Sequence, residues 1–192
     1  MNLAILKEVR VRRRETDLDK VAFKFAEALE KYGIRYAVVA GYVAVALGRP
    51  RTTEDIDFIV KVEDPKIILS SAEDAGFKLL TKIENLERDF QNTSIRFYLP
   101  PYYLPNVEVK RAKNRHHFYA IENRIRFYIG KSSIYIGPLE HQIAYKLYLG
   151  TNKDLEDAYF IWRLLRDKLS MDEIKKWAEE VGAEGRLWIL KR

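Results

Sequence analysis

The segment from residue 36 to residue 62 constrains the fold most, because its pattern changes from strand to helix and back within a short span. It opens with YAVVAG (36–41), a β-branched run ending in glycine that predicts a strand. The small residues of YVAVALG, which follow, favour a short, closely packed helix. DIDFIVKV (55–62) is rich in β-branched and aromatic residues and predicts a second strand. This order indicates an α/β domain built on a sheet.

Helical signals surround this segment. Thr16 and Asp19 form a capping box, and the apolar spacing behind them predicts a helix over 17–32. Asp64 and Pro65 predict another over 65–75. Residues 77–136 then break into short extended runs, with prolines that make 99–106 a loop or an edge connection. The predicted strand runs are FKLL, SIRFYL, NVEVKR, HFYAI, RIRFYI and SSIYI.

The rest of the chain, after Gly137-Pro138, has helical periodicity. It predicts three helices within 138–150, 153–169 and 170–182, the last with a second capping box. We therefore expect an α/β (α+β) fold in which helices flank a mixed sheet. Residues 1–136 are expected to form the catalytic domain, and 137–192 a helical subdomain packed on it.

The composition excludes several classes of protein. Cysteine is absent, which excludes disulfides, thiol catalysis and zinc sites of the finger type. No apolar run approaches the about 18 residues that a membrane span needs, and the first residues lack a signal-peptide pattern. We expect a cytoplasmic protein without a membrane partner. A charged fraction of 32% with only two Gln leans toward a thermophilic source.

Positive charge is concentrated in residues 92–135. Eight Lys or Arg against two Glu give this stretch 8 − 2 = +6, which equals the net charge of the whole chain. Interleaved aromatic residues suit a polyanionic partner such as a nucleoside triphosphate or RNA. The alternative is a solvated sheet face whose aromatic side chains point into the core.

Other cationic and histidine residues give weaker signals. The arginines at 10, 12, 13 and 14 suit contacts with an RNA backbone, or an ordinary solvated strand. The three histidines, His116, His117 and His141, lack the spacing of a transition-metal site. We interpret them as residues of the surface or of a groove that binds an acceptor molecule.

Asp55 and Asp57 are the strongest chemical signal. Residues two apart on a strand lie on one face, about 6 to 7 Å from each other, so the two carboxylates project side by side. Like charges at that range favour a cation between them, and magnesium prefers oxygen ligands. A solvated strand end is the alternative. Upstream, the turn at Gly41 offers free backbone N–H groups and a helix dipole to a triphosphate.

These residues carry a resemblance to a known family. The stretch VVAGYVAVALGRPRTTEDIDFIV is similar to the opening motif of the nucleotidyltransferase superfamily, a glycine turn followed by D-x-D. It looks closest to the abortive-infection type nucleotidyltransferase-like toxins, which place a Gly, an Arg and a Thr before the carboxylates, as Gly48, Arg51 and Thr53 stand here. The C-terminal helices match as well, at Pro138-Leu139-Glu140, Lys146-Leu147, Lys153-Asp154 and Asp157.

The resemblance implies roles for these residues. Asp55 and Asp57 would bind one or two magnesium ions, and Glu108 would be the third carboxylate, as both metal ligand and catalytic group, where the family usually has Asp. The implied nucleotide-binding residues are Gly41, Tyr42, Arg51, Thr53, Lys146, Lys153 and Asp154, with Asp157 bracing the site. Tyr42 stands where Gly or Ser is usual, so its side chain must point away from the phosphates. For the residues at 153, 154 and 157, surface ion pairs are the alternative.

The implied reaction transfers a nucleoside monophosphate from a nucleoside triphosphate to a hydroxyl acceptor. The basic stretch favours RNA, with transfer RNA among the family's acceptors, and the resemblance implies a toxin with an antitoxin partner. One alternative is a degenerate protein that binds nucleotide or a partner without turnover. Another is a small-molecule, antibiotic-type nucleotidyltransferase, which would need an acidic acceptor cleft.

Overall fold

The chain forms one mixed β-sheet with helices on both of its faces. A computed structural model describes residues 6–80 and 86–191. The eight strands lie in the order β1-β7-β8-β2-β3-β6-β5-β4, and parallel and antiparallel neighbours alternate along most of the sheet. The predicted mixed sheet flanked by helices is confirmed.

The elements follow the chain as β1 (Glu8–Val11), α1 (Asp17–Lys31), β2 (Arg35–Val39), α2 (Gly41–Ala46), β3 (Asp55–Lys61), α3 (Lys66–Asp74), β4 (Lys78–Leu79), α4 (Leu86–Asn92), β5 (Ser94–Tyr98), β6 (Asn106–Arg111), α5 (Arg115–Glu122), β7 (Ile125–Ile129), β8 (Ser132–Ile136), α6 (Leu139–Leu149), α7 (Asn152–Leu165), α8 (Met171–Val181) and the 3₁₀ segment η1 (Glu184–Lys191).

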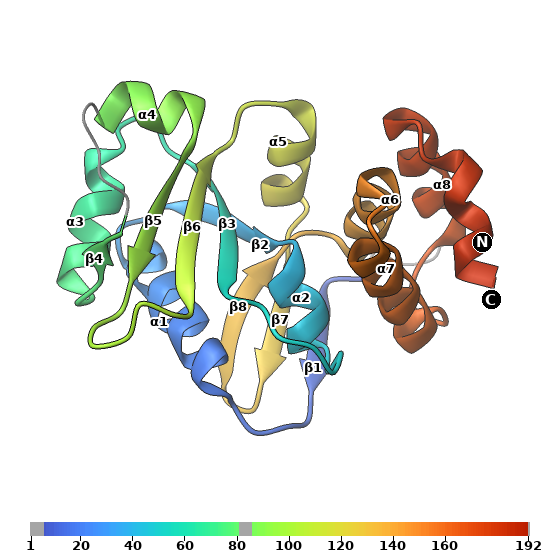
Figure 1. Ribbon diagram of the computed structural model, residues 1–192, viewed down its shortest axis with the longest axis horizontal. Coiled ribbons are helices and arrows are strands. Elements are labelled where there is room, and N and C mark those ends of the chain that lie inside the picture. Colours follow the sequence, from blue (N-terminus) through green and yellow to red (C-terminus); the bar gives the residue numbers. More distant parts are fainter. Residues whose placement is uncertain (1–5, 81–85, 192) are drawn as a thin grey trace.

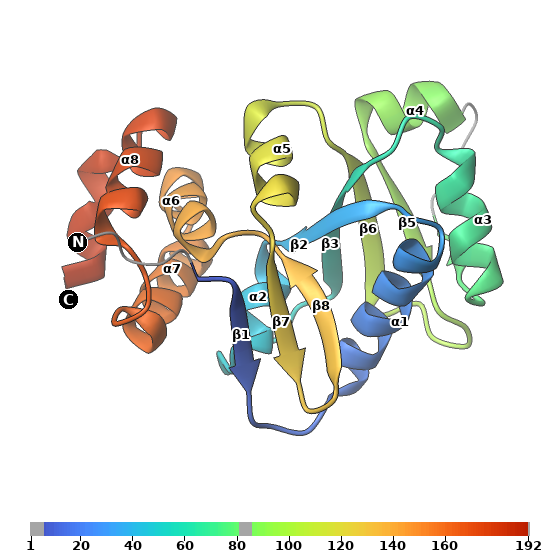
Figure 2. The same cartoon turned by 180° about the vertical axis from the view of Figure 1, so that it is seen from behind.

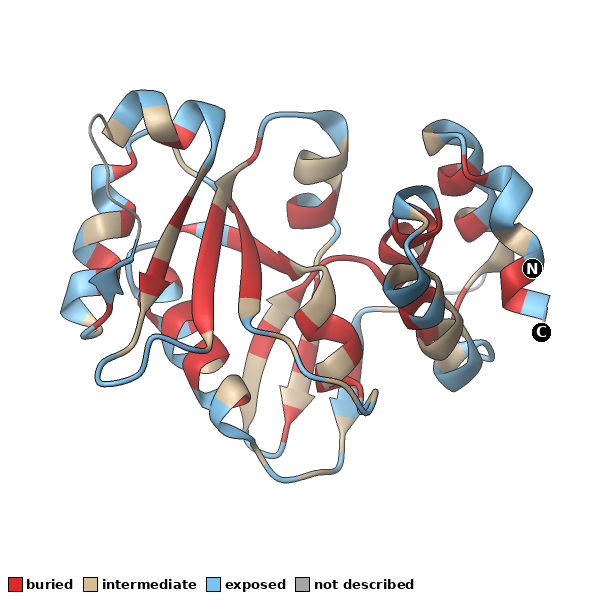
Figure 3. Cartoon of the chain, viewed as in Figure 1, coloured by how far each residue is buried: buried red, intermediate tan, exposed pale blue. Residues whose placement is uncertain are grey.

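Helices α1 and α3 cover the face of the sheet that is seen in Figure 2. The alternation of β3 explains this packing: Ile56, Phe58 and Val60 point to the main core, where the ring of Phe25 from α1 lies 5.1 Å from that of Phe58. The intervening residues of β3, among them Asp57, point to the opposite face. One face of the central strands is thus apolar and covered, and the other carries Asp57 and Glu108. Most residues of β3 and β6 are buried (Figure 3).

The predicted helices form close to their expected bounds. The Thr16 capping box is present at the start of α1, and Ser170 caps α8 by accepting from the backbone N–H of Glu173. Helices α6, α7 and α8 occupy the three C-terminal ranges expected from periodicity. Helix α4 and the η1 segment are additions that the sequence patterns did not indicate.

One predicted strand is wrong. The run HFYAI (117–121) lies in helix α5, not in the sheet. Asn114 caps this helix by accepting from the backbone N–H of His117 at 2.9 Å, and the buried Ala120 and Ile121 pack on the sheet with Ile59. The cap and the burial of one helical face outweigh the aromatic residues' preference for strands. Gly41, the predicted end of a strand, is instead the first residue of α2.

The C-terminal helices lie to one side of the sheet in Figure 1. They are joined to it through α2, because Arg49 and Arg51 after that helix bind Asp157 of α7. We propose that the chain divides near residue 137 into residues 1–136 and a helical subdomain of residues 137–192, as the sequence composition suggested. Residues 1–5, 81–85 and 192 lie outside the described residues. Among the helices that the structure describes, none is long and apolar enough to cross a membrane.

Candidate active site

Two rows of side chains cross the open face of strands β5, β6 and β3. In one row Tyr98, Asn106 and Asp55 are directly opposite one another, and in the next row Arg96, Glu108 and Asp57 are. Directly paired residues of neighbouring strands project to the same face. The sheet therefore places Asp55, Asp57 and Glu108 together, as the sequence interpretation requires.

Asp57 and Glu108 are both held by Lys110. Its ammonium nitrogen lies 2.8 Å from Oδ1 of Asp57 and 2.9 Å from Oε1 of Glu108. Arg96 approaches the other oxygen of Glu108, with Nη2 2.5 Å from Oε2. Sequence reasoning missed both cations, although Lys110 is two residues beyond Glu108 on the same face of a strand, and that spacing was the signal.

The electrostatics of this cluster follow from burial and from Lys110. Burial raises the pKa of Asp57, which is only 8% exposed, and Lys110 opposes the rise. Burial acts the same way on Glu108, but its contacts with Lys110, Ser94 and Arg96 outweigh burial and lower its pKa. The two carboxylates in turn raise the pKa of Lys110 against its own burial. The two carboxylates thus share one cation, which favours the charged form of both.

Asp55 is positioned at the start of β3. Thr53 donates its hydroxyl to Oδ1 of Asp55 at 3.2 Å, and the neighbouring Asn106 donates to the backbone oxygen of Glu54 at 3.1 Å. These contacts fix the backbone at the start of β3 and orient the carboxylate of Asp55. Thr53, predicted as a nucleotide-binding residue, therefore lies beside the carboxylates.

The donor set suits magnesium in part. Asp55 and Asp57 supply the carboxylate oxygens that this ion prefers, whereas both oxygens of Glu108 contact cations. Within residues 6–80 and 86–191 no group of three His, Asp or Glu side chains is arranged to hold a metal ion. Asp55 and Asp57 would thus hold the ion, and Glu108 would join them only after exchanging Lys110.

The turn between β2 and α2 brings the backbone close to Arg51. Ala40 has φ +62°, a region that residues with a side chain rarely adopt, and it turns the chain sharply into Gly41. Nη2 of Arg51 donates to the backbone oxygen of Gly41 at 3.2 Å. A Cβ on Gly41 would lie 2.9 Å from that nitrogen and 3.1 Å from Oγ1 of Thr53. A side chain at position 41 would therefore have to displace the end of the Arg51 side chain.

Tyr42 points away from this turn. Its side chain is fully buried, and its hydroxyl lies 3.0 Å from Oδ1 of Asp19 in α1. Arg13 binds both oxygens of the same Asp19, at 2.6 and 2.9 Å. Tyr42 therefore meets the condition that its side chain avoid the phosphates. Arg13 is part of this buried link and is not a free point charge of the N-terminal arginine cluster.

Asp157 is the centre of a second ionic cluster. It is fully buried and accepts from Nε and Nη2 of Arg51 at 2.9 and 2.8 Å and from Lys146 at 2.7 Å. Arg49, which sequence reasoning missed, contacts it as well. Lys146 also lies 3.5 Å from Asp154. The predicted residues Arg51, Lys146, Asp154 and Asp157 are thus brought together, and the surface ion pair expected as the alternative for Asp157 is excluded by its burial.

Lys153 is placed differently. It is exposed at the start of α7, and its backbone oxygen accepts from Arg49 at 3.0 Å. The structure assigns no contact of its side chain to the carboxylates.

A cleft of about 330 Å³ connects the two ionic clusters. Asp57 and Lys110 line it from the sheet, Lys146 and Asp154 from the helical side, and Ala40 from the turn. The three histidines line it too. His141 is buried rather than at the surface, and burial lowers its pKa to about 4. His116 Nδ1 lies 3.2 Å from Nε2 of His141.

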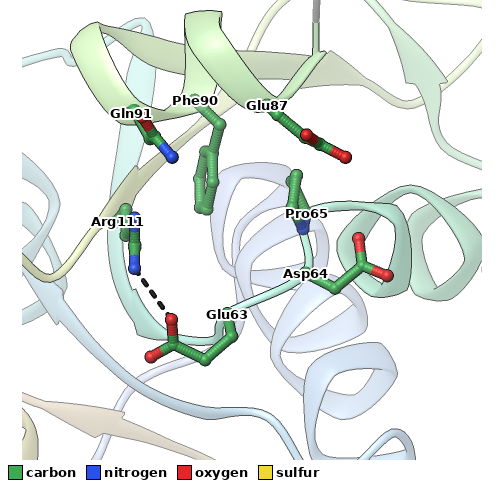
Figure 4. A pocket seen from close by; sticks show the side chains of 7 residues that line it. All are labelled: Glu63, Asp64, Pro65, Glu87, Phe90, Gln91 and Arg111. Carbon is green, nitrogen blue, oxygen red and sulfur yellow. Dashed lines mark hydrogen bonds and ion pairs between the residues drawn. The ribbon is translucent and has the colours of Figure 1, made fainter.

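A second cavity, of about 290 Å³, lies away from these residues (Figure 4). Glu63, Asp64 and Glu87 surround an apolar floor of Pro65 and Phe90. The one arginine of its lining, Arg111, is paired with Glu63 at 2.9 Å. Three carboxylates around one paired cation disfavour a polyanionic ligand in this cavity.

The basic stretch 92–135 does not form one continuous patch. Arg96 and Lys110 lie at the carboxylates, whereas Arg124 and Arg126 lie over the ring of Tyr135, 3.9 and 4.4 Å from its centroid. The aromatic residues divide likewise: Phe97 and Phe127 are core residues, and Tyr98 remains half-exposed. The core interpretation therefore holds for Phe97 and Phe127, and a polyanionic partner of the stretch stays a prediction.

No protein-family model and no curated protein matches the sequence. Solved structures do match. An antigenic nucleotidyltransferase-like protein from Paracoccidioides brasiliensis aligns with a TM-score of 0.61 at 18% identity, over 92% of this chain and 88% of its own. The solution structure of the antibiotic-resistance factor ANT(2″)-Ia aligns with a TM-score of 0.57 at 14% identity, over 92% and 97%. ANT(2″)-Ia in complex with adenylyl-2″-tobramycin gives 0.56 at 12%, over 88% and 99%.

At identities this low, the alignments establish the fold alone. The more specific likeness to abortive-infection type toxins stays a prediction. The alignments extend over 88 to 92% of this chain, so they include the eight-stranded sheet and the helices that flank it. The chain has the fold of the nucleotidyltransferase-like proteins.

Proposed function

We propose that the chain is a magnesium-dependent nucleotidyltransferase that moves a nucleoside monophosphate from a nucleoside triphosphate to a hydroxyl acceptor and releases pyrophosphate. The observation that carries the proposal is the direct pairing of Asp57 with Glu108 on adjacent strands of this fold, at the cleft that also contains Lys146. Carboxylates on one side and a buried cation on the other suit a metal-bound triphosphate.

Each residue has a chemical task in this proposal. Asp55 and Asp57 would hold magnesium, which neutralises charge on the phosphates when bound. Lys146, held by Asp157, would contact the triphosphate, and Arg51 would keep the Gly41 turn in place. Glu108 would accept the proton of the attacking hydroxyl through an oxygen that Lys110 or Arg96 has released.

RNA is the proposed acceptor, with transfer RNA as one candidate. ANT(2″)-Ia is described with an adenylylated aminoglycoside, and a polycationic acceptor of that kind requires an acidic cleft. Here Asp57 and Asp154 line the cleft together with Lys110 and Lys146. The two negative charges are thus matched by two positive charges. The resemblance to abortive-infection type toxins extends the proposal to a cytoplasmic toxin with an antitoxin protein as partner.

The proposal is tested by incubating the protein with magnesium, each α-labelled nucleoside triphosphate and total cellular RNA, then following label in RNA and protein. We expect transfer to fall at least ~10²-fold in Asp57→Asn, because the metal loses a ligand. The matched control is Asp172→Asn, whose carboxylate is 95% exposed on α8. Equal labelling by the wild type and Asp57→Asn would contradict the proposed site.

The second candidate is a nucleotide-binding protein without turnover. The ion pairs of Lys110 with Asp57 and Glu108 favour it, because a fixed cation can replace the metal. Nucleotide binding that does not depend on magnesium, together with no label in any acceptor, would select this candidate over the enzyme.

A further inference from the structure

A second surface adjoins the carboxylates on the side away from the cleft. Across the sheet, Asp57 faces β2 and the cleft, whereas Glu108 faces β5 through its contact with Arg96. If the nucleotide occupies the cleft, the acceptor hydroxyl must approach Glu108 from the β5 side. What lies on that side decides which acceptor fits.

Two tyrosine rings that contact each other lie there. The rings of Tyr98, at the end of β5, and Tyr103, in the following loop, are 4.6 Å apart and inclined by 34°. Tyr103 is 62% exposed, so its ring is open to solvent. Tyr98 is two residues beyond Arg96 on the same face, about 6 to 7 Å along the strand. Tyr98 therefore lies two residues along β5 from the arginine that contacts Glu108, on the same face of the sheet.

The surroundings of the pair are apolar and cationic. Lys78 of β4 is directly opposite Tyr98 and exposed, and Arg96 lies on the other side. The loop from 99 to 105, LPPYYLP, contains no charged residue, and Leu104 is 52% exposed. Open aromatic rings beside an exposed lysine suit unpaired bases joined by phosphates. Because the charge of Arg96 is paired with Glu108, Lys78 is the cation that would contact the phosphates and repel a cationic aminoglycoside.

We propose that Tyr98 and Tyr103 form a stacking platform for the end of a single-stranded RNA, and that Lys78 contacts its backbone. This inference rests on the proposed function, whose acceptor it places. The terminal base stacks on the tyrosines, and its ribose hydroxyl then lies toward Glu108. Double-stranded RNA does not fit, because its bases are already stacked on one another.

The test is the fluorescence anisotropy of a labelled single-stranded RNA of about twelve nucleotides, within the length that such sites cover. It is measured in EDTA without nucleotide, so it does not depend on catalysis. We expect Tyr103→Ala to weaken binding about 5-fold or more and Tyr103→Phe, which keeps the ring, less than about 2-fold. Lys78→Met should weaken binding and flatten its salt dependence.

Tyr102→Ala is the matched control, since Tyr102 is the neighbouring tyrosine and is 73% exposed. Binding by Tyr103→Ala equal to that of the wild type, or an equal loss in Tyr102→Ala, would overturn the platform. Equally tight binding of duplex RNA would overturn it as well.

The transfer assay separates this inference from the proposed function. In Tyr103→Ala we expect a higher KM for RNA with the KM for nucleotide unchanged. Label in protein or a small molecule, with no RNA binding by the wild type, would overturn the platform and leave the enzyme. RNA binding that depends on Tyr103, with no transfer to any acceptor, would leave the platform and overturn the enzyme.

Discussion

Asp57 and Glu108 are 51 residues apart in sequence (108 − 57) and directly opposite each other on the parallel strands β3 and β6, where the ammonium of Lys110 contacts both. Because the ammonium of Lys110 lies between these two carboxylates, it takes the position that a bound cation would occupy. The strength of magnesium binding should therefore depend on how readily Lys110 leaves the carboxylates.

Lys110→Met tests this competition. Without the ammonium, Asp57 and Glu108 repel each other, so the thermal midpoint in EDTA should fall. Magnesium should then raise the midpoint more in the variant than in the wild type, because the ion displaces nothing. Lys61→Met is the control, as Lys61 has a similar exposure of 45% on β3 and pairs with Glu122 at 3.7 Å. An identical magnesium shift in Lys110→Met and the wild type would show that Lys110 does not compete.

Asp157→Asn should destabilise the fold strongly. Asp157 is fully buried against Arg49, Arg51 and Lys146, and removal of one partner from a buried ionic cluster costs about 3 to 5 kcal/mol. Glu156→Gln on the same helix should cost less than about 1 kcal/mol, since that side chain is 70% exposed. Urea unfolding measures both free energies. Similar losses in the two variants would mean that the cluster is not the link between the sheet and α7.

Gly41→Ala should impair the nucleotide site more than the fold. The new methyl would lie 2.9 Å from Nη2 of Arg51, so the guanidinium must move away from the backbone oxygen that it binds. We expect severalfold weaker nucleotide binding, measured by calorimetry, with a stability loss of about 1 kcal/mol or less. Gly185→Ala is the control because a methyl there meets nothing within 4 Å. Unchanged nucleotide affinity in Gly41→Ala would place the phosphates elsewhere.

The burial of His141 predicts that the protein loses stability in mild acid. Burial lowers its folded pKa to about 4, below the value of about 6.5 in the unfolded chain, so the unfolded state binds the proton first. The stabilisation by neutral His141 is present above pH 6.5 and is lost as the pH falls toward 4, by about 2 kcal/mol between pH 7 and pH 5. In His141→Gln this part of the pH dependence should disappear. Urea midpoints at both pH values measure it, and an equal slope in the variant would assign the loss to other groups.

Local patterns predicted most of the elements. The capping boxes at Thr16 and Ser170 mark true helix starts, and the alternation of residues 55–62 correctly places Asp55 and Asp57 on one face. These signals depend only on residues a few positions apart, which one strand or helix turn brings together. The helix at 115–122 escaped prediction because its aromatic residues suit a strand, and the Asn114 cap together with packing against Ile59 decides between the two.

The sequence by itself determined the α/β fold and the two aspartates of one strand face, because these follow from periodicity and residue chemistry. The resemblance to the nucleotidyltransferase superfamily implied Glu108 as their partner. Only the tertiary structure decided that Lys110 and Arg96 neutralise Glu108, that Asp157 joins Arg49, Arg51 and Lys146, and that the ring of Tyr98 contacts that of Tyr103. The physical reason is that these contacts depend on strand register and on the packing of α7 against the sheet, which no local pattern contains.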